Sequence, residues 1–245
     1  MMSTKRYAPT APILLYHRFD PNGPTTLWTV GTDVFEAQLQ WLKQNSYRVL
    51  PLRSVIDEMR GVGPPVGPRA VVITADDGDR SVYTDMFPLL KKFGVPATLF
   101  VTPFAISRSD GCVTWEQLKE MSASGLVDVQ FHTLSHPDFE FERKRRGRGG
   151  FQVLAEFELD HSRDWIEQRL NQTVDMLAWP YGYYDQDLEQ LAAQSGFVAA
   201  FSIIRRSAED DSIFAVPRVV VANRHRAGER FRALVEQPHP NGQNL

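Results

Sequence analysis

Several features that would indicate a particular class of protein are scarce in this chain of 245 residues. It has one cysteine, Cys112, which excludes an intrachain disulfide and a zinc–thiolate cluster. No stretch approaches the ~20 consecutive apolar residues that a membrane-spanning helix needs. The formal net charge of −3 argues against a nucleic-acid-binding protein, because such domains are usually strongly basic. These absences leave a globular protein whose partners are small or neutral.

The bulk composition predicts one domain with an ordinary core. With 42% hydrophobic residues, the chain has enough apolar surface to fold as a single unit over 1–245, with a core of about 12–235. The first apolar stretch, Ile13 to Tyr16, is too short for the core of a signal peptide. We therefore expect a cytoplasmic protein from the chain as written, and an extracytoplasmic one if a leader has been removed.

Short runs rich in β-branched residues alternate with longer helical patterns along the chain. This alternation is typical of successive β/α units around a mainly parallel sheet. The predicted fold class is α/β, a distorted (β/α) barrel of seven to eight strands whose catalytic groups gather at the C-terminal strand ends. The eight predicted strands are Pro12–His17, Arg48–Leu52, Ala70–Ala75, Ala97–Val101, Val127–Phe131, Val174–Ala178, Val198–Ile203 and Val216–Val221.

Helix-start signals precede several of the helical patterns. Asp33–Glu36 and Thr114–Gln117 both resemble capping boxes, in which an N-terminal side chain and the residue three positions on satisfy free backbone N–H groups. The longest helix is expected from about Val153 to Leu170, where Asn171 would end it. The basic, glycine-rich stretch Glu142–Gly150 is expected to be a mobile solvated loop, or else a lid that attracts an anionic substrate.

Two adjacent carboxylates, Asp76 and Asp77, stand where the apolar strand Ala70–Ala75 ends. Such a pair is costly unless a positive group neutralises part of it. A second apolar run ends at His132, and His136 follows four residues later, so that one turn of backbone can bring both imidazoles to the same side. The two strand ends together therefore predict a metal site.

One carboxylate and two imidazoles form a three-ligand face that leaves room for water and a substrate. The second acid would then be free to accept a proton from that water. A helical zinc protease is disfavoured, because Thr133 stands where such enzymes carry the glutamate base. A non-haem iron oxygenase suits the ligand set but does not explain the second carboxylate. The structural alternative is a salt-bridged Asp pair with two hydrogen-bonded loop histidines.

Three segments resemble, in order, the motifs of the polysaccharide deacetylases, carbohydrate esterase family 4, also described as the NodB-homology domain. They are Thr74–Gly78 (TADDG), His132–Pro137 (HTLSHP) and Trp179–Gly182 (WPYG). Further segments resemble the branch that deacetylates poly-β-1,6-N-acetylglucosamine, and the likeness covers about 12–221; these segments are Pro12–Arg18, Pro96–Phe100 and Pro217–Val219.

The resemblance implies a division of labour among these residues. Asp77, His132 and His136 would hold one divalent metal ion, with zinc preferred over cobalt, nickel and iron, and Asp76 would be the general base. In the poly-N-acetylglucosamine branch the motifs look circularly permuted, and the Tyr-His pair near the start supplies the acid. We therefore expect His17 to be the catalytic acid, the alternative being a histidine bonded to a loop carbonyl.

A substrate-binding surface is expected around the third motif. Flat rings with a polar tip suit a sugar-binding wall, which Trp179, Pro180, Tyr181 and Gly182 would supply. Ala178 stands where many family members carry arginine, and Arg218 is grouped with this surface. Arg218 could instead approach Asp76 and tune it, or be an ordinary surface cation.

The function expected from these residues is metal-dependent removal of N-acetyl groups from an N-acetylated amino sugar, in an oligosaccharide, a polysaccharide or a precursor. Asp76 would act as base and metal-bound water as nucleophile. Two alternatives stand beside it. One is a related hydrolase of a non-sugar amide or cyclic imide, and the other is a carbohydrate-binding relative without turnover. The intact Asp76 argues against the latter, because binding alone does not need a free base.

Overall fold

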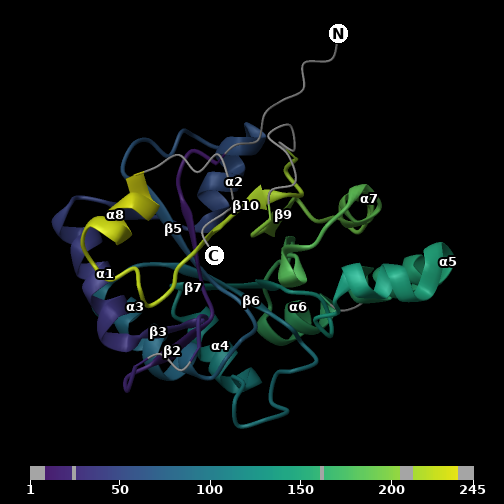
Figure 1. The fold of residues 1–245 in the computed structure, drawn as a ribbon, viewed down its shortest axis with the longest axis horizontal. Coiled ribbons are helices and arrows are strands. Elements are labelled where there is room, and N and C mark those ends of the chain that lie inside the picture. Colours follow the sequence, from purple (N-terminus) through teal and green to yellow (C-terminus); the bar gives the residue numbers. More distant parts are fainter. Residues whose placement is uncertain (1–8, 24–25, 161–162, 205–211, 237–245) are drawn as a thin grey trace.

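A computed structural model describes residues 9–23, 26–160, 163–204 and 212–236 of the chain. Its centre is a nearly closed, barrel-like sheet in which every neighbouring pair of strands is parallel (Figure 1). The strands follow the order β10-β9-β8-β7-β6-β5-β1-β11. Their bounds are β1 Ile13–Tyr16, β5 Ala70–Ala75, β6 Ala97–Val101, β7 Val127–Phe131, β8 Met176–Ala178, β9 Ala199–Ser202, β10 Val216–Pro217 and β11 Val219–Val220.

The closing segment of the barrel is the short stretch from Val216 to Val220. Its first half, β10, pairs with β9, whereas its second half, β11, pairs with β1. Arg218 separates the two halves, and its backbone N–H donates to the backbone carbonyl of Ser202 at 2.9 Å. One segment therefore joins the last strand of the sheet to the first, and the residue at the switch between them is a charged one.

The strands are apolar on both faces because the outer face packs against helices and the inner face fills the interior of the barrel. Along β5 all six residues are buried, and successive side chains point to opposite faces. Val71, Ile73 and Ala75 belong to one apolar cluster, while Ala70 and Val72 belong to a second that includes residues of helix α2. The bounds of the helices are α1 Thr32–Gln44, α2 Leu52–Arg60, α3 Phe87–Phe93, α4 Trp115–Ala123, α5 Phe139–Asp160, α6 Asp164–Leu170, α7 Gln186–Gln194 and α8 Glu229–Glu236.

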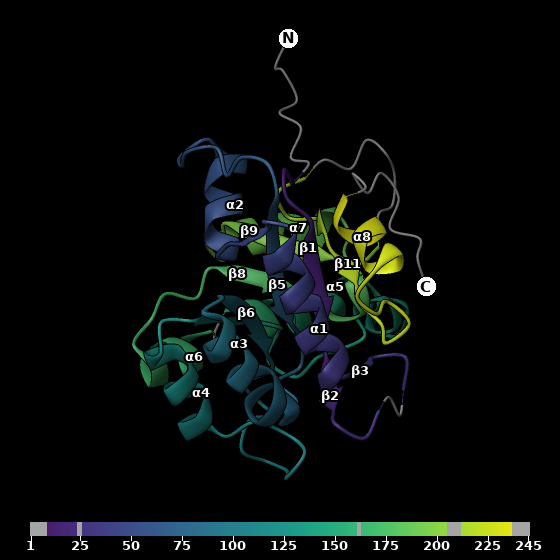
Figure 2. The same cartoon turned by 90° about the vertical axis from the view of Figure 1, so that its left-hand side faces the viewer.

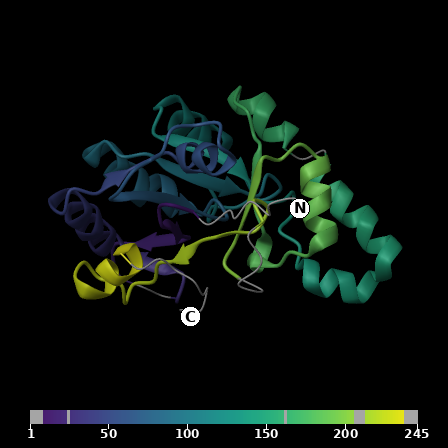
Figure 3. The same ribbon diagram turned by 90° about the horizontal axis from the view of Figure 1, so that it is seen from above.

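The helices α1, α3 and α4 lie on one side of the barrel, and α5 and α7 on the other (Figures 1 and 2). Seen from above, α5 and α7 run beside each other at the edge of the molecule (Figure 3). Within the described ranges, no helix is both long and apolar enough to cross a membrane.

The barrel-like α/β fold is confirmed, and the predicted strands differ from those observed mainly at their ends. The expected strand Arg48–Leu52 shrinks to β4, Arg48–Val49, because Leu52 already begins α2. A small parallel pair was not predicted, namely β2 (Arg18–Asp20) with β3 (Thr29–Gly31). Each of these strands has only three residues, which are too few to show the alternation of apolar and polar residues that predicts a strand.

One of the two capping boxes is confirmed. At α4 the Thr114 side chain accepts from the backbone N–H of Gln117, and the Gln117 side chain accepts from the N–H of Thr114. The prediction for Asp33 is wrong, because α1 already begins at Thr32 and has no side-chain cap. The apolar face of α1 is as expected, because Phe35, Leu39 and Leu42 are buried.

The expectation for the basic stretch Glu142–Gly150 is also corrected. It is helical and belongs to α5, with a break at Gly147, where φ is 65° and ψ is 177°. Glutamates three or four residues before the cations explain the helix, because such pairs stabilise helical backbone. These pairs are Glu140–Lys144, Glu142–Arg145 and Glu142–Arg146.

The predicted helix Val153–Leu170 is divided between α5, which ends at Asp160, and α6. Its predicted end is confirmed, because Asn171 forms a left-handed cap with φ of 51°. His161, which falls within the predicted helix, lies outside the described residues.

Candidate metal centre and active site

The C-terminal end of β5 directs its two carboxylates to different places. Asp77 has a left-handed backbone with φ of 72°, and Gly78 follows with φ of 77°. At Gly78 a Cβ would lie 3.2 Å from the Ile106 side chain, so this tight turn favours glycine. The turn leaves Asp76 buried at 2% exposure, whereas 40% of the Asp77 side chain remains accessible.

Asp77 converges with the two histidines of the second motif. Its Oδ1 lies 3.5 Å from Nε2 of His132 and 3.6 Å from Nε2 of His136. One potential ligand atom from each of the three residues lies within 4.8 Å of the others, and among the described residues this is the one such group of three or more His, Cys, Asp or Glu side chains. The donor set is one that a divalent metal ion accepts.

The orientation of His132 leaves the required nitrogen available. Its Nδ1 lies 2.8 Å from the carbonyl oxygen of Ala178 at the end of β8, so this nitrogen donates to the carbonyl. The ring is thereby held in the tautomer whose Nε2 presents a lone pair toward Asp77. Ala178 thus contributes through its backbone, which no side-chain pattern could reveal.

Asp76 is held by Arg218, the residue at the switch between β10 and β11. Nη1 and Nη2 of Arg218 donate to Oδ1 and Oδ2 of Asp76 at 2.7 and 2.6 Å. Burial alone would raise the pKa of Asp76, but the guanidinium outweighs it and holds that pKa below its ordinary value. Oδ2 of Asp76 also lies 3.8 Å from Nε2 of His132, so the carboxylate borders the ligand group.

Among the alternatives for Arg218, the structure has the one in which it approaches Asp76, and its place on the substrate-binding surface is corrected. Arg218 is only 4% exposed and is engaged with Asp76 through both terminal nitrogens, so it is neither a surface cation nor free to bind substrate directly. Its guanidinium also lies 5.3 Å from the centre of the Phe100 ring. It reaches Asp76 from the barrel-closing segment Val216–Val220.

His17 lies directly after β1, next to the end of β5. The two strands pair in register up to Tyr16 and Ala75, so His17 and Asp76 follow paired positions. Burial lowers the pKa of His17 below its usual 6.5, although the charges of Asp76 and Asp77 oppose the shift. The Trp28 ring lies 4.6 Å from the His17 ring, centre to centre, and is itself 36% exposed. The imidazole is thus sheltered but remains near the surface.

The three residues of the ligand group also have shifted pKa values. Burial would raise the pKa of Asp77, but the nearby histidines hold it well below its ordinary value. Burial would lower the pKa of His132, yet Asp76 and Asp77 raise it. Burial lowers the pKa of His136, and neighbouring His132 adds to the effect. Both carboxylates are therefore ionised at neutral pH and present negative charge to a cation.

Only one of the four residues expected to form the sugar-binding wall has an exposed side chain. Tyr181 is 60% exposed, has a left-handed backbone with φ of 55°, and places its ring 4.7 Å from that of His136. Trp179 is 1% exposed and donates from Nε1 to the carbonyl of Phe214 at 2.8 Å. The expectation of an open wall is thus corrected for Trp179, because its ring fills the core.

Pro180 and Gly182 are buried as well, so the correction extends to them. Gly182 has φ of 72°, and a Cβ there would lie 2.6 Å from the Ile203 side chain. These two residues shape the turn that carries Tyr181 to the surface.

Sequence reasoning missed one buried acid that contacts the second motif. Glu158 of α5 is 2% exposed and accepts hydrogen bonds from the backbone N–H and hydroxyl of Ser135 at 2.9 and 2.6 Å. The available signal was its position on the apolar face of α5, beside Ala155 and Leu159, where a carboxylate needs a partner.

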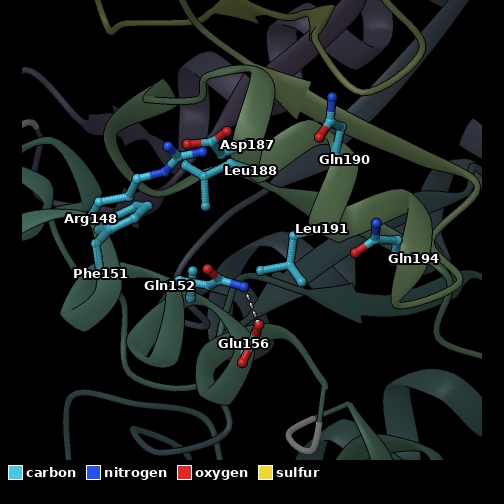
Figure 4. Close-up of a pocket in the computed structure, with 10 residues that line it drawn as sticks. Arg148, Phe151, Gln152, Glu156, Asp187, Leu188, Gln190, Leu191 and Gln194 are labelled. Carbon is cyan, nitrogen blue, oxygen red and sulfur yellow. Dashed lines mark hydrogen bonds between the residues drawn. The ribbon is translucent and has the colours of Figure 1, made fainter.

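A cleft of about 240 Å³ lies away from this site, between α5 and α7 (Figure 4). Its polar lining includes Arg148, Gln152, Glu156 and Asp187, and the close-up shows the hydrogen bond from Gln152 to Glu156. It contains none of the predicted site residues, and we assign it no part in the chemistry.

The chain resembles known deacetylases both in sequence and in structure. Over 216 residues the chain is 26% identical to the poly-beta-1,6-N-acetyl-D-glucosamine N-deacetylase of Staphylococcus epidermidis, which covers 86% of this chain and 72% of that protein. The deacetylase PplD of Streptococcus pyogenes, solved in complex with acetate, superposes with a TM-score of 0.80 at 26% identity, covering 94% of this chain and 100% of that one.

The structure of IcaB from Ammonifex degensii gives a TM-score of 0.74 at 27% identity and covers 87% of this chain and 92% of that one. The family model for polysaccharide deacetylases matches residues 63–200, a range that contains Asp76, Asp77, His132 and His136. Since this match spans more than half of the chain, the protein belongs to the polysaccharide deacetylase family.

Proposed function

We propose that this protein is a metal-dependent N-deacetylase that removes acetyl groups from an N-acetylated amino sugar in an oligosaccharide or polysaccharide. The observation that carries the proposal is the convergence of Asp77, His132 and His136 beside a second carboxylate, Asp76, that an arginine keeps ionised. A site built only for structure or for sugar binding does not need an ionised acid next to a ligand group.

The residues present fit a divalent metal ion. One carboxylate oxygen and two imidazole nitrogens approach one another from two strand ends, and the Ala178 carbonyl fixes the ring of His132. This donor set suits zinc, and it also accepts cobalt, nickel or iron. When bound, such an ion lowers the pKa of a coordinated water and polarises the acetamide carbonyl.

In this proposal Asp76 is the general base. Arg218 keeps its carboxylate ionised, so Asp76 can accept the proton of the attacking water. Each carboxylate oxygen has a further lone pair beyond the one that Arg218 uses, so the ion pair does not block this role. Arg218 also restrains the carboxylate, which keeps the base beside the ligand group instead of among the ligands.

His17 is the group that we propose to protonate the departing amine nitrogen. It follows the strand that is paired with β5, and its pKa is influenced by both Asp76 and Asp77. Trp28 covers one side of the imidazole, which limits its contact with water. An acid is needed because an amine leaves poorly from an acetamide unless it is protonated.

The proposed substrate class rests on the relatives and on the exposed rings. The relative from Staphylococcus epidermidis is named for poly-β-1,6-N-acetylglucosamine. In this chain Tyr181 and Trp28 have partly exposed rings next to His136 and His17, which suits contact with the apolar face of a sugar. We therefore propose a β-linked N-acetylglucosamine chain as the first substrate to test.

Acetate release from a panel of N-acetylated oligosaccharides and cyclic amides, with and without a chelator, tests the proposal. We expect release from the oligosaccharides, loss of activity after chelation and recovery after Zn²⁺ is added back. Activity that survives complete removal of metal would refute the mechanism. Turnover of the cyclic amides alone would assign the protein to the non-sugar amide hydrolases.

A further inference from the structure

The loop between the two histidines has a backbone that its residues do not favour. Thr133 and His136 both adopt left-handed conformations, with φ of 62° and 59°. For a β-branched residue such as Thr133 this region is rarely occupied, and such strain persists only where the surroundings hold it. Inside the loop, the backbone N–H of His136 donates to the Thr133 hydroxyl at 3.2 Å, and further bonds hold the loop from outside.

The first half of the loop is supported from neighbouring strand ends. His132 is bonded through its ring to the Ala178 carbonyl, and its own carbonyl accepts from the Thr102 hydroxyl at 3.3 Å. The carbonyl of Leu134 accepts the backbone N–H of Phe104 at 3.1 Å. These bonds act on the residues up to Leu134 and hold the first ligand, His132.

The second half is tied to α5 instead. Ser135, which directly precedes His136, donates its backbone N–H to Oε2 of Glu158 at 2.9 Å and its hydroxyl to Oε1 at 2.6 Å. Hydrogen bonds to a charged carboxylate are stronger than those between neutral groups. Both oxygens of this buried side chain thus accept a hydrogen bond from the residue next to the second ligand.

Glu158 is itself rigidly placed. It stands on the buried face of α5, beside Ala155 and Leu159, which are 2% and 0% exposed. An apolar side chain there would avoid the cost of removing a carboxylate from water, so packing does not account for the choice of glutamate. The bonds to Ser135 are one reason for a carboxylate at this position.

We propose that Glu158 is a positioning residue that sets the place of His136 in the ligand group, and that part of the affinity for metal is built on α5. The inference rests on the proposed function, because it assumes that Asp77, His132 and His136 bind a metal ion. Ligands must be held within a few tenths of an ångström for tight binding, and a tie at the adjacent residue does this for His136.

Zinc titration of the whole chain of 245 residues tests the proposal. The protein is stripped of metal and titrated with Zn²⁺ in competition with a chromophoric chelator, while urea unfolding of the metal-free form reports its stability. We expect Glu158→Leu to raise the dissociation constant for Zn²⁺ roughly 10- to 100-fold, the range found when groups that orient metal ligands are removed. Glu156→Leu on the same helix is the matched control, and it should leave that constant unchanged.

Glu158→Gln distinguishes positioning from charge. The glutamine carbonyl can accept the N–H of Ser135, and its amide can donate to the Ser135 hydroxyl, so we expect zinc affinity within about threefold of the unaltered protein. Should Glu158→Leu not fold, Ser135→Ala decides the question, because it removes one hydrogen bond without altering α5. We expect it to weaken zinc binding roughly fivefold.

Unchanged zinc affinity in a folded Glu158→Leu protein, or in Ser135→Ala where the former does not fold, would overturn the inference and leave the proposed function standing. A variant that is less stable but binds Zn²⁺ with unchanged affinity would also overturn the inference, because the hydrogen bonds to Ser135 would then serve stability alone. If the unaltered protein binds no Zn²⁺, Co²⁺ or Ni²⁺, the proposed function fails and the inference fails with it.

Discussion

At the scale of single residues, two neighbouring aspartates have unequal surroundings. Asp76 is buried and ion-paired with Arg218, whereas Asp77 is partly exposed and faces His132 and His136. The left-handed turn at Asp77 creates this difference, because it sends consecutive side chains in different directions. Asp77 can therefore bind a cation while Asp76 stays paired with Arg218.

This difference predicts opposite effects for two substitutions. Asp77→Ala removes a ligand and should lose the metal, whereas Asp76→Asn should keep it and lower kcat/KM by about 10²- to 10⁴-fold, the usual contribution of a general base. Metal content by elemental analysis and acetate release provide the two readouts. Equal loss of metal in both variants would contradict the assigned roles.

The ion pair with Arg218 predicts a change in pH dependence. Arg218 opposes the effect of burial on Asp76, so the pKa of Asp76 should rise in Arg218→Met. The base must be ionised to act, and the acidic limb of the pH–rate profile should therefore move to higher pH. Arg218→Lys is the control, because it keeps a positive charge and should retain a limb closer to the original.

The same ion pair affects stability with a defined sign. Because the pKa of Asp76 is lowered in the folded state, its contribution is present above the unfolded value of about 3.9 and is lost as pH falls through the folded value. Unfolding by urea at several pH values should show this loss in the unaltered protein. In the pH–rate profile of enzyme activity, an acidic limb that does not move in Arg218→Met would exclude the proposed tuning of Asp76.

The acid role proposed for His17 predicts a dependence on the leaving group. His17→Ala should nearly abolish acetamide hydrolysis and should leave metal content intact, because His17 is not part of the ligand group. An activated aryl acetate needs no protonation of its leaving group, so its hydrolysis should fall much less. Equal losses on both substrates would indicate that His17 acts in another way.

At the scale of secondary-structure elements, two similar signals had different outcomes. Thr114–Gln117 forms a complete capping box, but α1 begins before Asp33 and takes no side-chain cap. Asp33 satisfies the same residue pattern, yet Thr32 before it is already helical and Gly31 is the N-cap. The pattern alone does not determine where the first helical turn closes.

These helix starts predict unequal stability effects. Thr114→Ala should reduce the free energy of unfolding by about 1 kcal/mol, because a backbone N–H at the start of α4 loses its acceptor. Asp33→Ala removes only a favourable charge near the start of α1 and should cost about 0.5 kcal/mol or less. Urea denaturation of both variants measures the difference, and equal losses would argue against the cap at Thr114.

At the scale of the whole molecule, barrel closure assembles the site. His17, the Asp pair, the His pair and Arg218 come from β-strand ends spread over 201 positions, between residues 17 and 218. Parallel pairing aligns these ends at one edge of the barrel. Arg218 joins them only because the segment Val216–Val220 pairs with both β9 and β1.

The proposed binding of metal at this site predicts a change in global stability. Zn²⁺ at 100 times its dissociation constant should stabilise the folded protein by about 2.7 kcal/mol if it binds the folded state alone. For a protein of this size the midpoint of thermal unfolding should then rise by roughly 5–10 °C. Calorimetry with Asp77→Ala as control measures the effect, and an equal rise in that variant would place the zinc elsewhere.

Much of this protein follows from local patterns in its sequence. The apolar run Ala70–Ala75 predicts a buried strand because β-branched residues favour extended backbone, and the motifs at its end and at His132 identify the polar groups that must be neutralised. The alternation of such strands with helical stretches is enough to predict the parallel barrel.

Contacts between distant residues depended on the tertiary structure. It decided that Arg218 reaches Asp76 instead of the surface, that Trp179 is buried while Tyr181 is exposed, and that Glu158 holds the loop before His136. The physical reason is that hydrophobic periodicity reports only which face of an element is apolar. The partner of a buried polar group is selected by barrel closure and packing, which bring residues far apart in sequence within hydrogen-bonding distance.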